Sequence, residues 1–285
     1  MLDDALDPDP SALTDVVGGA LCHDLSERAE RVRWRWADVP WGALDPARAS
    51  PALRALVRGM AFSEQTTYAA TLRLLDQLRD DVDFSQWMSV WLYEETRHPQ
   101  ALLRWLWLLG ERFDADFILR GRTASPPPRS KMGALVINVL SELVAAGAYR
   151  GLSERSPEPL LKYLARALAA DEARHAAGFH AYAQRHLAVA ADPRRERLEA
   201  LKVLRAWLRD AGQVTHPVRL AVEGAMSSEG GRDLLGDIEE AVTAEQLCRM
   251  IGKLLGLRLR GPGEIEECMR GVLATEGESR RDRAQ

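Results

Sequence analysis

The chain has 285 residues, of which 46% are hydrophobic and 28% charged, and its formal net charge at pH 7 is −4. This balance is typical of a soluble globular protein and excludes a disordered or fibrous one. Charged or polar residues interrupt every apolar run before it reaches the roughly 18 residues of a membrane-spanning helix, and no basic stripe interleaved with aromatic residues indicates a nucleic-acid partner. The acidic N-terminus, MLDDALDPDP, is unlike a secretory or organellar signal, so we expect a cytoplasmic protein.

The cysteine pattern indicates neither a disulfide framework nor a zinc site. The cysteines are odd in number and form no Cys-x-x-Cys pair. We therefore interpret Cys22, Cys248 and Cys268 as buried thiols.

The hydrophobic pattern predicts an all-α fold. Apolar residues recur at intervals of three and four, and the short β-branched runs typical of strands are missing. Proline and glycine clusters separate the predicted helices, which are 11–36, 50–79, 84–110, 113–120, 130–153, 158–189, 193–211, 233–257 and 264–275. Several of them are long enough to form a helical bundle with a buried site. We expect one domain over 1–285, with a core at about 30–215, a C-terminal helical appendage at about 216–278 and a frayed tail.

Two histidines stand in nearly the same sequence context. The segments EETRH, which ends at His98, and DEARH, which ends at His175, both read acid-Glu-x-Arg-His. Positions i and i+3 share a helix face, so Glu95 can pair with His98, and Glu172 with His175, to offer one carboxylate oxygen and one imidazole nitrogen to the same point. Carboxylate and imidazole together suit iron or manganese.

Each motif is preceded by a further glutamate on the helix before it. Glu64 lies 31 residues before Glu95, and Glu142 lies 30 residues before Glu172, as an approximate internal two-fold would require. The flanks of Glu64 and Glu142 are the least charged parts of their helices, where an isolated carboxylate is costly to bury unless it meets a cation. The four glutamates and two histidines match the ligand set of ferritin-like dinuclear bundles. The alternative is a set of solvent-facing charges that form i,i+4 pairs.

The chain resembles the soluble acyl-acyl-carrier-protein desaturases over about residues 30–215. The resemblance rests on WLYEETRH (91–98), AADEARH (169–175) and the SEQTTY and SELVAAG helices. It implies a cytoplasmic or stromal homodimer with two iron ions, manganese being the alternative metal. Such an enzyme uses O2 and electrons from a reduced ferredoxin to insert a cis double bond into an acyl chain carried on acyl carrier protein.

The matched positions imply roles for individual residues. The implied metal ligands are Glu64, Glu95, His98, Glu142, Glu172 and His175. Trp91 and Asp171 would stand behind the ligands as an electron or proton relay, with Asp171 fixing a ligand histidine through its other ring nitrogen. The alternatives are a core aromatic for Trp91 and a solvated helix residue for Asp171.

Some positions depart from the family pattern. The desaturases place a threonine, thought to assist oxygen activation, where this chain has Ala145 and Ala146. Pro99 removes the amide that would bond the carbonyl of Glu95, which predicts a kink at the ligands. The small residues at 144–148 leave room for a substrate tunnel. A carrier-protein substrate further predicts a basic rim, with candidates Arg31, Arg33, Arg120, Arg122, Arg129 and Lys131.

Other functions stay open. One is a di-iron oxygenase or N-oxygenase of specialised metabolism, although the helix around Glu142 lacks the third histidine ligand of such N-oxygenases. Another is a catalytically silent ferritin-like binding protein, favoured by the missing threonine. A ribonucleotide reductase small subunit fits poorly, because Leu102 stands where its radical tyrosine would be.

Overall fold

The computed structural model describes residues 21–123, 128–209 and 242–282, and the side chains up to residue 274. Within these ranges the chain forms α-helices and short 3-10 turns and no strand, which confirms the predicted all-α class. The α-helices are α2 (Leu21–Val32), α3 (Pro51–Ser63), α4 (Thr66–Gln77), α5 (Val82–Leu108), α6 (Ala115–Gly121), α7 (Lys131–Arg155), α8 (Pro159–Val189), α9 (Pro193–Arg209), α12 (Ala244–Leu255) and α13 (Ile265–Asp282). The 3-10 turns are η1 (Trp36–Asp38), η2 (Trp41–Ala43), η3 (Pro46–Arg48) and η4 (Pro262–Glu264).

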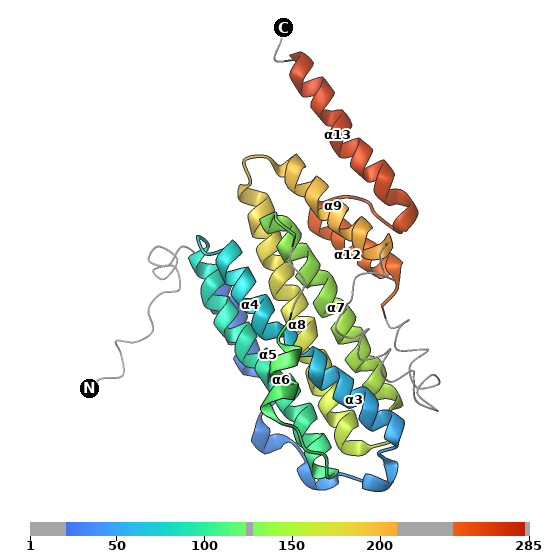
Figure 1. Cartoon of the computed structure of the whole chain (residues 1–285). Coiled ribbons are helices and arrows are strands. Elements are labelled where there is room, and N and C mark those ends of the chain that lie inside the picture. The colour runs from blue at the N-terminus through green and yellow to red at the C-terminus, as the bar shows by residue number, and fades with distance from the viewer. Residues whose placement is uncertain (1–20, 124–127, 210–241, 283–285) are drawn as a thin grey trace, which may run out of the picture.

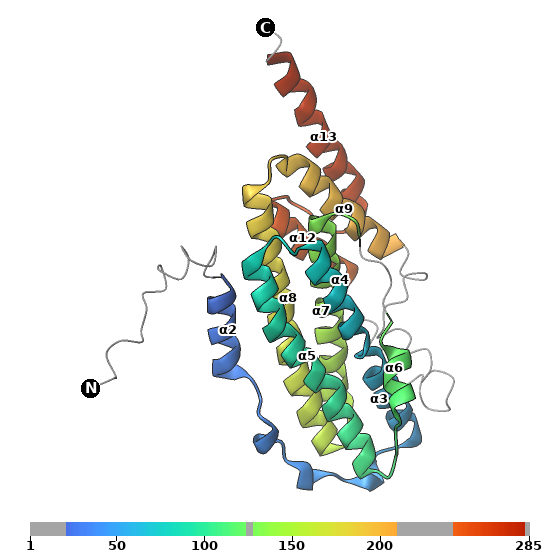
Figure 2. The ribbon, with the colours of Figure 1, turned by 60° about the vertical axis from the view of Figure 1, so that its left-hand side comes forward.

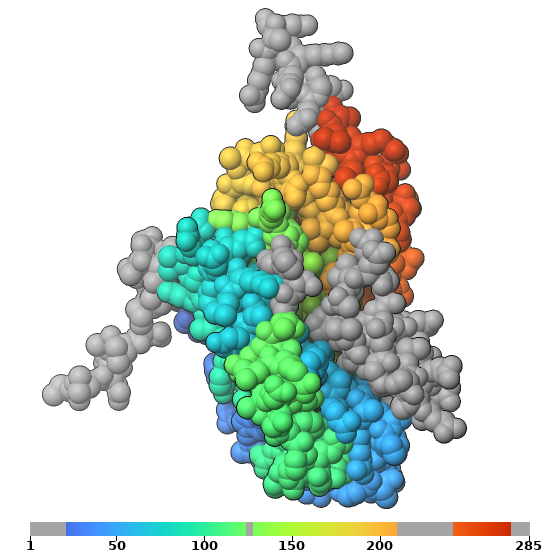
Figure 3. All heavy atoms as spheres, in the orientation of Figure 1, coloured from blue at the N-terminus to red at the C-terminus, as the bar shows by residue number. Residues whose placement is uncertain are grey.

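The centre of the molecule is a bundle of long helices. The α3–α4 pair, α5, α7 and α8 run side by side along the long axis (Figures 1 and 2), and α7 and α8 pack against each other along their length. Helix α2 lies against α5. Helices α9 and α12 cover one end of the bundle, and α13 projects beyond it (Figure 2). Helix α6 lies against α3 on the face shown in Figure 3.

Two apolar clusters fill the two ends of the bundle and leave a gap between them. The first cluster includes Trp91 of α5 and Phe179 of α8, and the second includes Ala101 of α5 and Leu168 of α8. Between Trp91 and Ala101 on α5, and between Leu168 and Phe179 on α8, neither cluster has a buried member. Both Glu-x-x-His motifs fall in this gap, so the fold surrounds them with apolar side chains at both ends.

Side-chain caps fix where the long helices begin. Asp81 accepts a hydrogen bond from the Phe84 amide at the start of α5 (3.0 Å), and Ser130 caps α7 in the same way. Glu158 is fully buried at the start of α8, where it accepts from the Leu161 amide (2.7 Å). It also accepts from the Trp105 indole (2.7 Å), which ties α8 to α5.

The single helix predicted for 50–79 is wrong, because the chain forms α3 and α4 with a break at Glu64. Around the break, the amides of Gln65 and Thr67 bond carbonyls three residues back instead of four. The side-chain amide of Gln65 donates to the carbonyl of Ala61 (3.1 Å), the acceptor that a continuous helix would pair with the Gln65 backbone. Glu64 keeps a helical backbone conformation, so the tightened turn changes the register of the helix while its direction is kept.

Other boundaries also differ from the predictions. Helix α2 ends at Val32 and Trp36 begins a 3-10 turn, whereas one helix was predicted for 11–36, of which 11–20 lie outside the described residues. Residues 233–241 of the predicted 233–257 helix lie outside them as well. Helix α5 continues through the buried Pro99 to Leu108. Helix α12 ends where Gly256 takes the left-handed conformation at φ 65°.

Helix α12 belongs to the main core. Leu247, Cys248 and Ile251 are buried in the same apolar cluster as Leu204 of α9. Of the appendage predicted for 216–278, residues 216–241 lie outside the described residues.

The cysteines are free thiols, but the prediction that all of them are buried is wrong. Cys22 and Cys268 are half-buried, whereas Cys248 is fully buried. Burial raises the pKa of the Cys248 thiol to about 11. Only Cys248 therefore has the surroundings of an inert core thiol.

One described helix, α7, is long and apolar enough to cross a membrane by length and composition. Of its most apolar window, 72% is buried inside the protein, which is the pattern of a core helix.

We predict that Gly178→Ala destabilises the fold, because the new methyl group would overlap the indole of Trp87 on α5. Overpacking of this kind costs about 1–3 kcal/mol. The matched control is Gly271→Ala on α13, where a methyl group meets nothing within 4 Å and improves helix propensity. Urea unfolding should separate the two variants; equal stabilities would contradict the close packing of α5 on α8.

Candidate metal centre

The six predicted ligands converge in the gap between the apolar clusters. They come from four parts of the bundle: the α3–α4 junction, α5, α7 and α8. Their ligand atoms form two groups, and within each group the atoms lie within 4.8 Å of one another. The first group is Glu64, Glu95, His98 and Glu172, and the second is Glu95, Glu142, Glu172 and His175. The helices therefore bring all six residues together, and Glu95 and Glu172 belong to both groups.

The distances around the two histidines repeat the same pattern. His98 Nδ1 lies 3.2 Å from Glu172 Oε1, 3.8 Å from Glu64 Oε2 and 4.0 Å from Glu95 Oε2. Two ligands of one ion, each about 2.1 Å from it, stand at most about 4.2 Å apart. The oxygen atoms around His98 are thus at the spacing that one shared cation requires.

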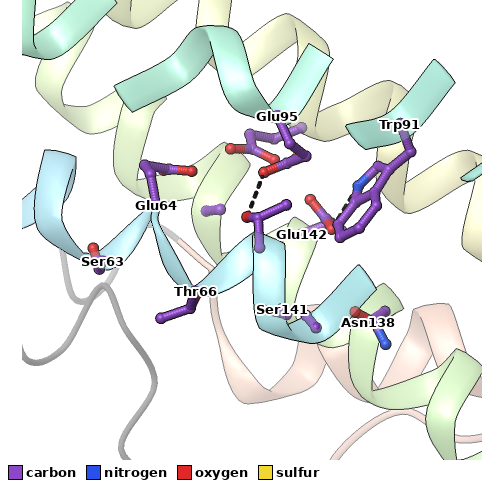
Figure 4. Close-up of a pocket in the computed structure, with 12 residues that line it drawn as sticks. Ser63, Glu64, Thr66, Trp91, Glu95, Asn138, Ser141 and Glu142 are labelled. Atoms are coloured by element: carbon purple, nitrogen blue, oxygen red, sulfur yellow. Dashed lines mark hydrogen bonds between the residues drawn. The ribbon is translucent and has the colours of Figure 1, made fainter. Parts of the chain in front are cut away.

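His175 Nδ1 has the equivalent neighbours. It lies 2.7 Å from Glu95 Oε1, 3.5 Å from Glu172 Oε2 and 3.7 Å from Glu142 Oε2. Figure 4 shows the carboxylates of Glu64, Glu95 and Glu142 turned toward one another, with the indole of Trp91 beside them. Glu95 and Glu172 stand between the histidines, where they could bridge two ions.

The two histidines are held by acids from each other's helices. His98 Nε2, on α5, lies 3.2 Å from Asp171 Oδ2 on α8. His175 Nε2, on α8, lies 3.0 Å from Glu94 Oε2 on α5. Glu94 was not predicted as a functional residue. The signal available in the sequence was that an acid directly precedes the Glu of both motifs. Each acid fixes the proton on Nε2 and leaves Nδ1 free to face the cluster.

Both of these acids are ionised. Burial raises the pKa of Glu94, but the hydrogen bond to His175 and the charges of His175 and Arg174 outweigh it and lower the pKa to about 2. Burial also raises the pKa of Asp171. The hydrogen bond to His98 and the positive charges of His98 and Arg174 outweigh burial and hold this pKa below its usual range. Arg174 Nη2 contacts both acids, at 3.0 Å and 2.5 Å, so one guanidinium links the two halves.

The inner carboxylates crowd one another. Burial, and then the charge of Glu142, raise the pKa of Glu95. Burial and the charge of Glu95 raise the pKa of Glu172 well above its usual value. Although burial lowers them, the pKa values of His98 and His175 are raised by the surrounding carboxylates. The cluster without metal therefore retains protons where cations would otherwise neutralise it.

Buried atoms without partners show that the residues fit a metal ion. Glu95 Oε1, His98 Nδ1 and His175 Nδ1 are buried and make no hydrogen bond of good geometry, although Glu95 Oε1 and His175 Nδ1 lie 2.7 Å apart. An unsatisfied buried polar group costs about 1–3 kcal/mol. All three atoms face the cluster centre, where a cation would satisfy them together. The buried acidic and histidine cluster can therefore hold a metal ion.

Three further side chains donate hydrogen bonds to carboxylates of the cluster. Trp91 Nε1 donates to Glu142 Oε1 (3.2 Å), so Trp91 contacts a candidate ligand as well as the core. Thr67 Oγ1 donates to Glu95 Oε2 (3.0 Å), and the Tyr149 hydroxyl donates to Glu64 Oε1.

Thr67 and Tyr149 were not predicted. Thr67 lies three residues after Glu64, and Tyr149 lies seven after Glu142, so helical spacing was the signal available for each. Thr67 thus places a hydroxyl group on Glu95 from α4.

A small cavity reaches the carboxylates between α4, α5 and α7. It measures about 80 Å³. Apart from the cluster itself, Trp91 and Thr67, its walls are mostly polar and consist of Ser63, Thr66, Ala70, Asn138, Ser141 and Ala145. From the small-residue run 144–148, in which a tunnel was predicted, only Ala145 lines this cavity. Residues 146–148 are buried.

Four of the six residues predicted for a basic rim pair with acids of this chain. Arg31 pairs with Glu27 (2.6 Å), Lys131 with Asp80 (2.5 Å) and Arg120 with Asp116 (3.0 Å). Arg33 is turned inward to Glu94, whereas Arg122 lies over the ring of Tyr68.

We predict that Glu94→Gln and Asp171→Asn each weaken metal binding by about 10–100-fold, because the neutral amide no longer fixes the histidine behind the ligand. The matched control is Glu154→Gln, an exposed position on α7. Competition with a chromophoric chelator measures the affinities. Unchanged affinity in both buried variants would show that the crossed contacts do not support a metal site.

No protein-family model matches the sequence, and no curated protein matches it.

Proposed function

We propose that the protein is an O2-dependent oxidase with a dinuclear iron centre. The observation that carries this proposal is the doubled arrangement of one histidine nitrogen and three carboxylate oxygens, with Glu95 and Glu172 common to both halves. Shared carboxylates of this kind suit two ions side by side. Oxygen and imidazole ligands favour iron, with manganese as the alternative.

The charges around the cluster support two divalent ions. Four carboxylates, three of them buried, would balance two doubly charged cations, so the loaded centre would carry no large net charge in the low-dielectric core. Outside it, Glu94 and Asp171 are balanced by Arg174, and Arg33 Nε donates to Glu94 Oε1 (2.9 Å). With a single divalent ion, the remaining carboxylate charge would have to be neutralised by protons.

The chain's own residues would orient the ligands and handle protons. Two ferrous ions bound here would supply electrons for the reduction of O2. Asp171 and Glu94 hold the histidine rings, and the Thr67 hydroxyl donates a hydrogen bond to Glu95 Oε2 on the wall of the cavity. The Tyr149 hydroxyl holds Glu64 Oε1 and leaves Oε2 facing His98.

Two substrate classes follow from different observations. The resemblance to acyl-acyl-carrier-protein desaturases supports a carrier-bound acyl chain, with a reduced ferredoxin as electron donor, a homodimer and a cytoplasmic location. The cavity supports a small polar substrate and oxygen insertion or N-oxygenation. At about 80 Å³ it is smaller than the usual ligand pocket of about 300–1,000 Å³, and most of the residues that line it are polar.

We predict that the protein, loaded anaerobically with ferrous iron and desalted, retains about two iron ions per chain. Glu142→Ala should retain about one or fewer, because it removes a ligand of the His175 half only. The oxidised wild type should also absorb in the near ultraviolet. Glu154→Ala is the control and should match wild type. Wild type that binds neither iron nor manganese would contradict the proposal and favour a binding protein.

We predict that the loaded protein turns over one of the two substrate classes with O2 and a reduced ferredoxin. Desaturation removes two hydrogens from the acyl chain, whereas oxygenation adds one oxygen atom, so mass spectrometry of the products separates them. Carrier-bound acyl chains of several lengths and a panel of small amines and alcohols are the substrates. An iron-loaded protein that consumes no O2 with any of them and a reduced donor would contradict an oxidase.

A further inference from the structure

A second polar cavity lies behind the histidines, away from the one that reaches the carboxylates. It is formed by residues 30–36 and by α5, and it measures about 200 Å³. Its lining is Glu30, Arg33, Trp34, Arg35, Trp36, Tyr93 and Arg97. No residue lines both cavities. The proposed oxidase function does not use this cavity.

Arg97 is buried in the wall of this cavity with most of its hydrogen-bonding capacity unused. The residue is 4% exposed. Its Nη2 donates to the carbonyl of Trp34, whereas Nε and Nη1 have no partner. The guanidinium carbon lies 3.9 Å from the ring centroid of Trp34. This cation–π contact stabilises the positive charge, but it gives the guanidinium N–H groups no hydrogen-bond acceptor. Within the described part of the chain, no carboxylate lies within ion-pair distance of Arg97.

The lining of this cavity carries more positive than negative charge. It contains the guanidinium groups of Arg33, Arg35 and Arg97 but only one carboxylate, that of Glu30. Arg33 is paired with Glu30 (2.8 Å) and, outside the lining, with Glu94 (2.9 Å), so the positive charge available to a ligand is that of Arg35 and Arg97. Arg35 is exposed at the rim. A buried guanidinium with free donors, a second one at the rim and aromatic walls are the features that recognise a carboxylate or phosphate group.

We propose that this cavity binds a small oxyanion, the carboxylate or phosphate group of a small molecule, with Arg97 as its buried anchor. The anion accepts hydrogen bonds from the free donors of Arg97 and lies near the charge of Arg35. A volume of about 200 Å³ limits the ligand to a compact molecule.

The cavity is connected to both histidines of the metal cluster. Trp34 Nε1 donates to Asp171 Oδ2 (2.8 Å), the same oxygen that contacts His98. Arg33 donates to Glu94, the acid that holds His175. An anion that attracts Arg33 or displaces the Trp34 indole changes hydrogen bonds behind both histidines. Occupancy of the cavity therefore modulates the metal centre without touching the ligands.

The test is isothermal titration of the full-length, metal-free protein at low ionic strength with inorganic phosphate and, separately, with acetate. We expect saturable binding of one anion per chain, with quenching or enhancement of tryptophan fluorescence from Trp34 and Trp36. Arg35→Gln should weaken binding about fivefold, as loss of a rim charge does. Arg97→Gln should weaken it at least about tenfold. The control Arg31→Gln, exposed and outside the cavity, should bind as wild type does.

The anion that binds identifies the class: phosphate alone indicates a phosphorylated ligand, and acetate indicates a carboxylate. No saturable binding of either anion to wild type would overturn the proposal, and so would affinity that both Arg35→Gln and a folded Arg97→Gln leave unchanged. Circular dichroism establishes whether Arg97→Gln is folded. If it is not, Arg35→Glu decides, because charge reversal at the rim must abolish binding, and unchanged affinity overturns the proposal. Iron content is measured separately, so failure here is distinguishable from failure of the oxidase.

Discussion

The mutual repulsion of four carboxylates gathered inside one helical bundle, three of them buried, is the constraint on which the rest of the structure depends. Glu95 and Glu172 are almost fully buried, their pKa values are raised, and apolar clusters close both ends of the space around them. Carboxylates in such a place require cations or protons. The histidines can supply protons or donate nitrogen ligands, so the same six residues explain both how the empty protein tolerates this charge and why it would bind metal.

The helices are tied to one another through this cluster by a crossed pair of contacts. Asp171 on α8 holds His98 on α5, and Glu94 on α5 holds His175 on α8. Each half thus supports its histidine with an acid from the other helix, but the carboxylates that belong to one half only have different hydrogen-bond donors. A tyrosine hydroxyl holds Glu64, whereas the indole of Trp91 holds Glu142. A nearly symmetric set of residues therefore lies in asymmetric surroundings, which would give two bound ions different environments.

Helical spacing predicts four of the six clustered residues, and Glu64 and Glu142 were added because each precedes a motif by a similar distance and has an uncharged flank. Glu95 and His98 share a face at i and i+3 wherever the helix packs, and the same holds for Glu172 and His175. The break at Glu64 was not predictable in this way, since it depends on a local choice between hydrogen bonds to the third and fourth preceding carbonyl. Arg33 was expected at the surface, but tertiary packing brings Glu94 to it and turns it inward. Cavity size depends on packing between helices, which no single segment determines.

The most direct test of a dinuclear centre is anomalous X-ray diffraction from crystals of the iron-loaded protein, measured above and below the iron absorption edge. The proposed dinuclear centre predicts two anomalous peaks per chain, one beside His98 Nδ1 and one beside His175 Nδ1, with Glu95 and Glu172 in contact with both. A single peak, or iron located outside the six residues at full loading, would contradict the account.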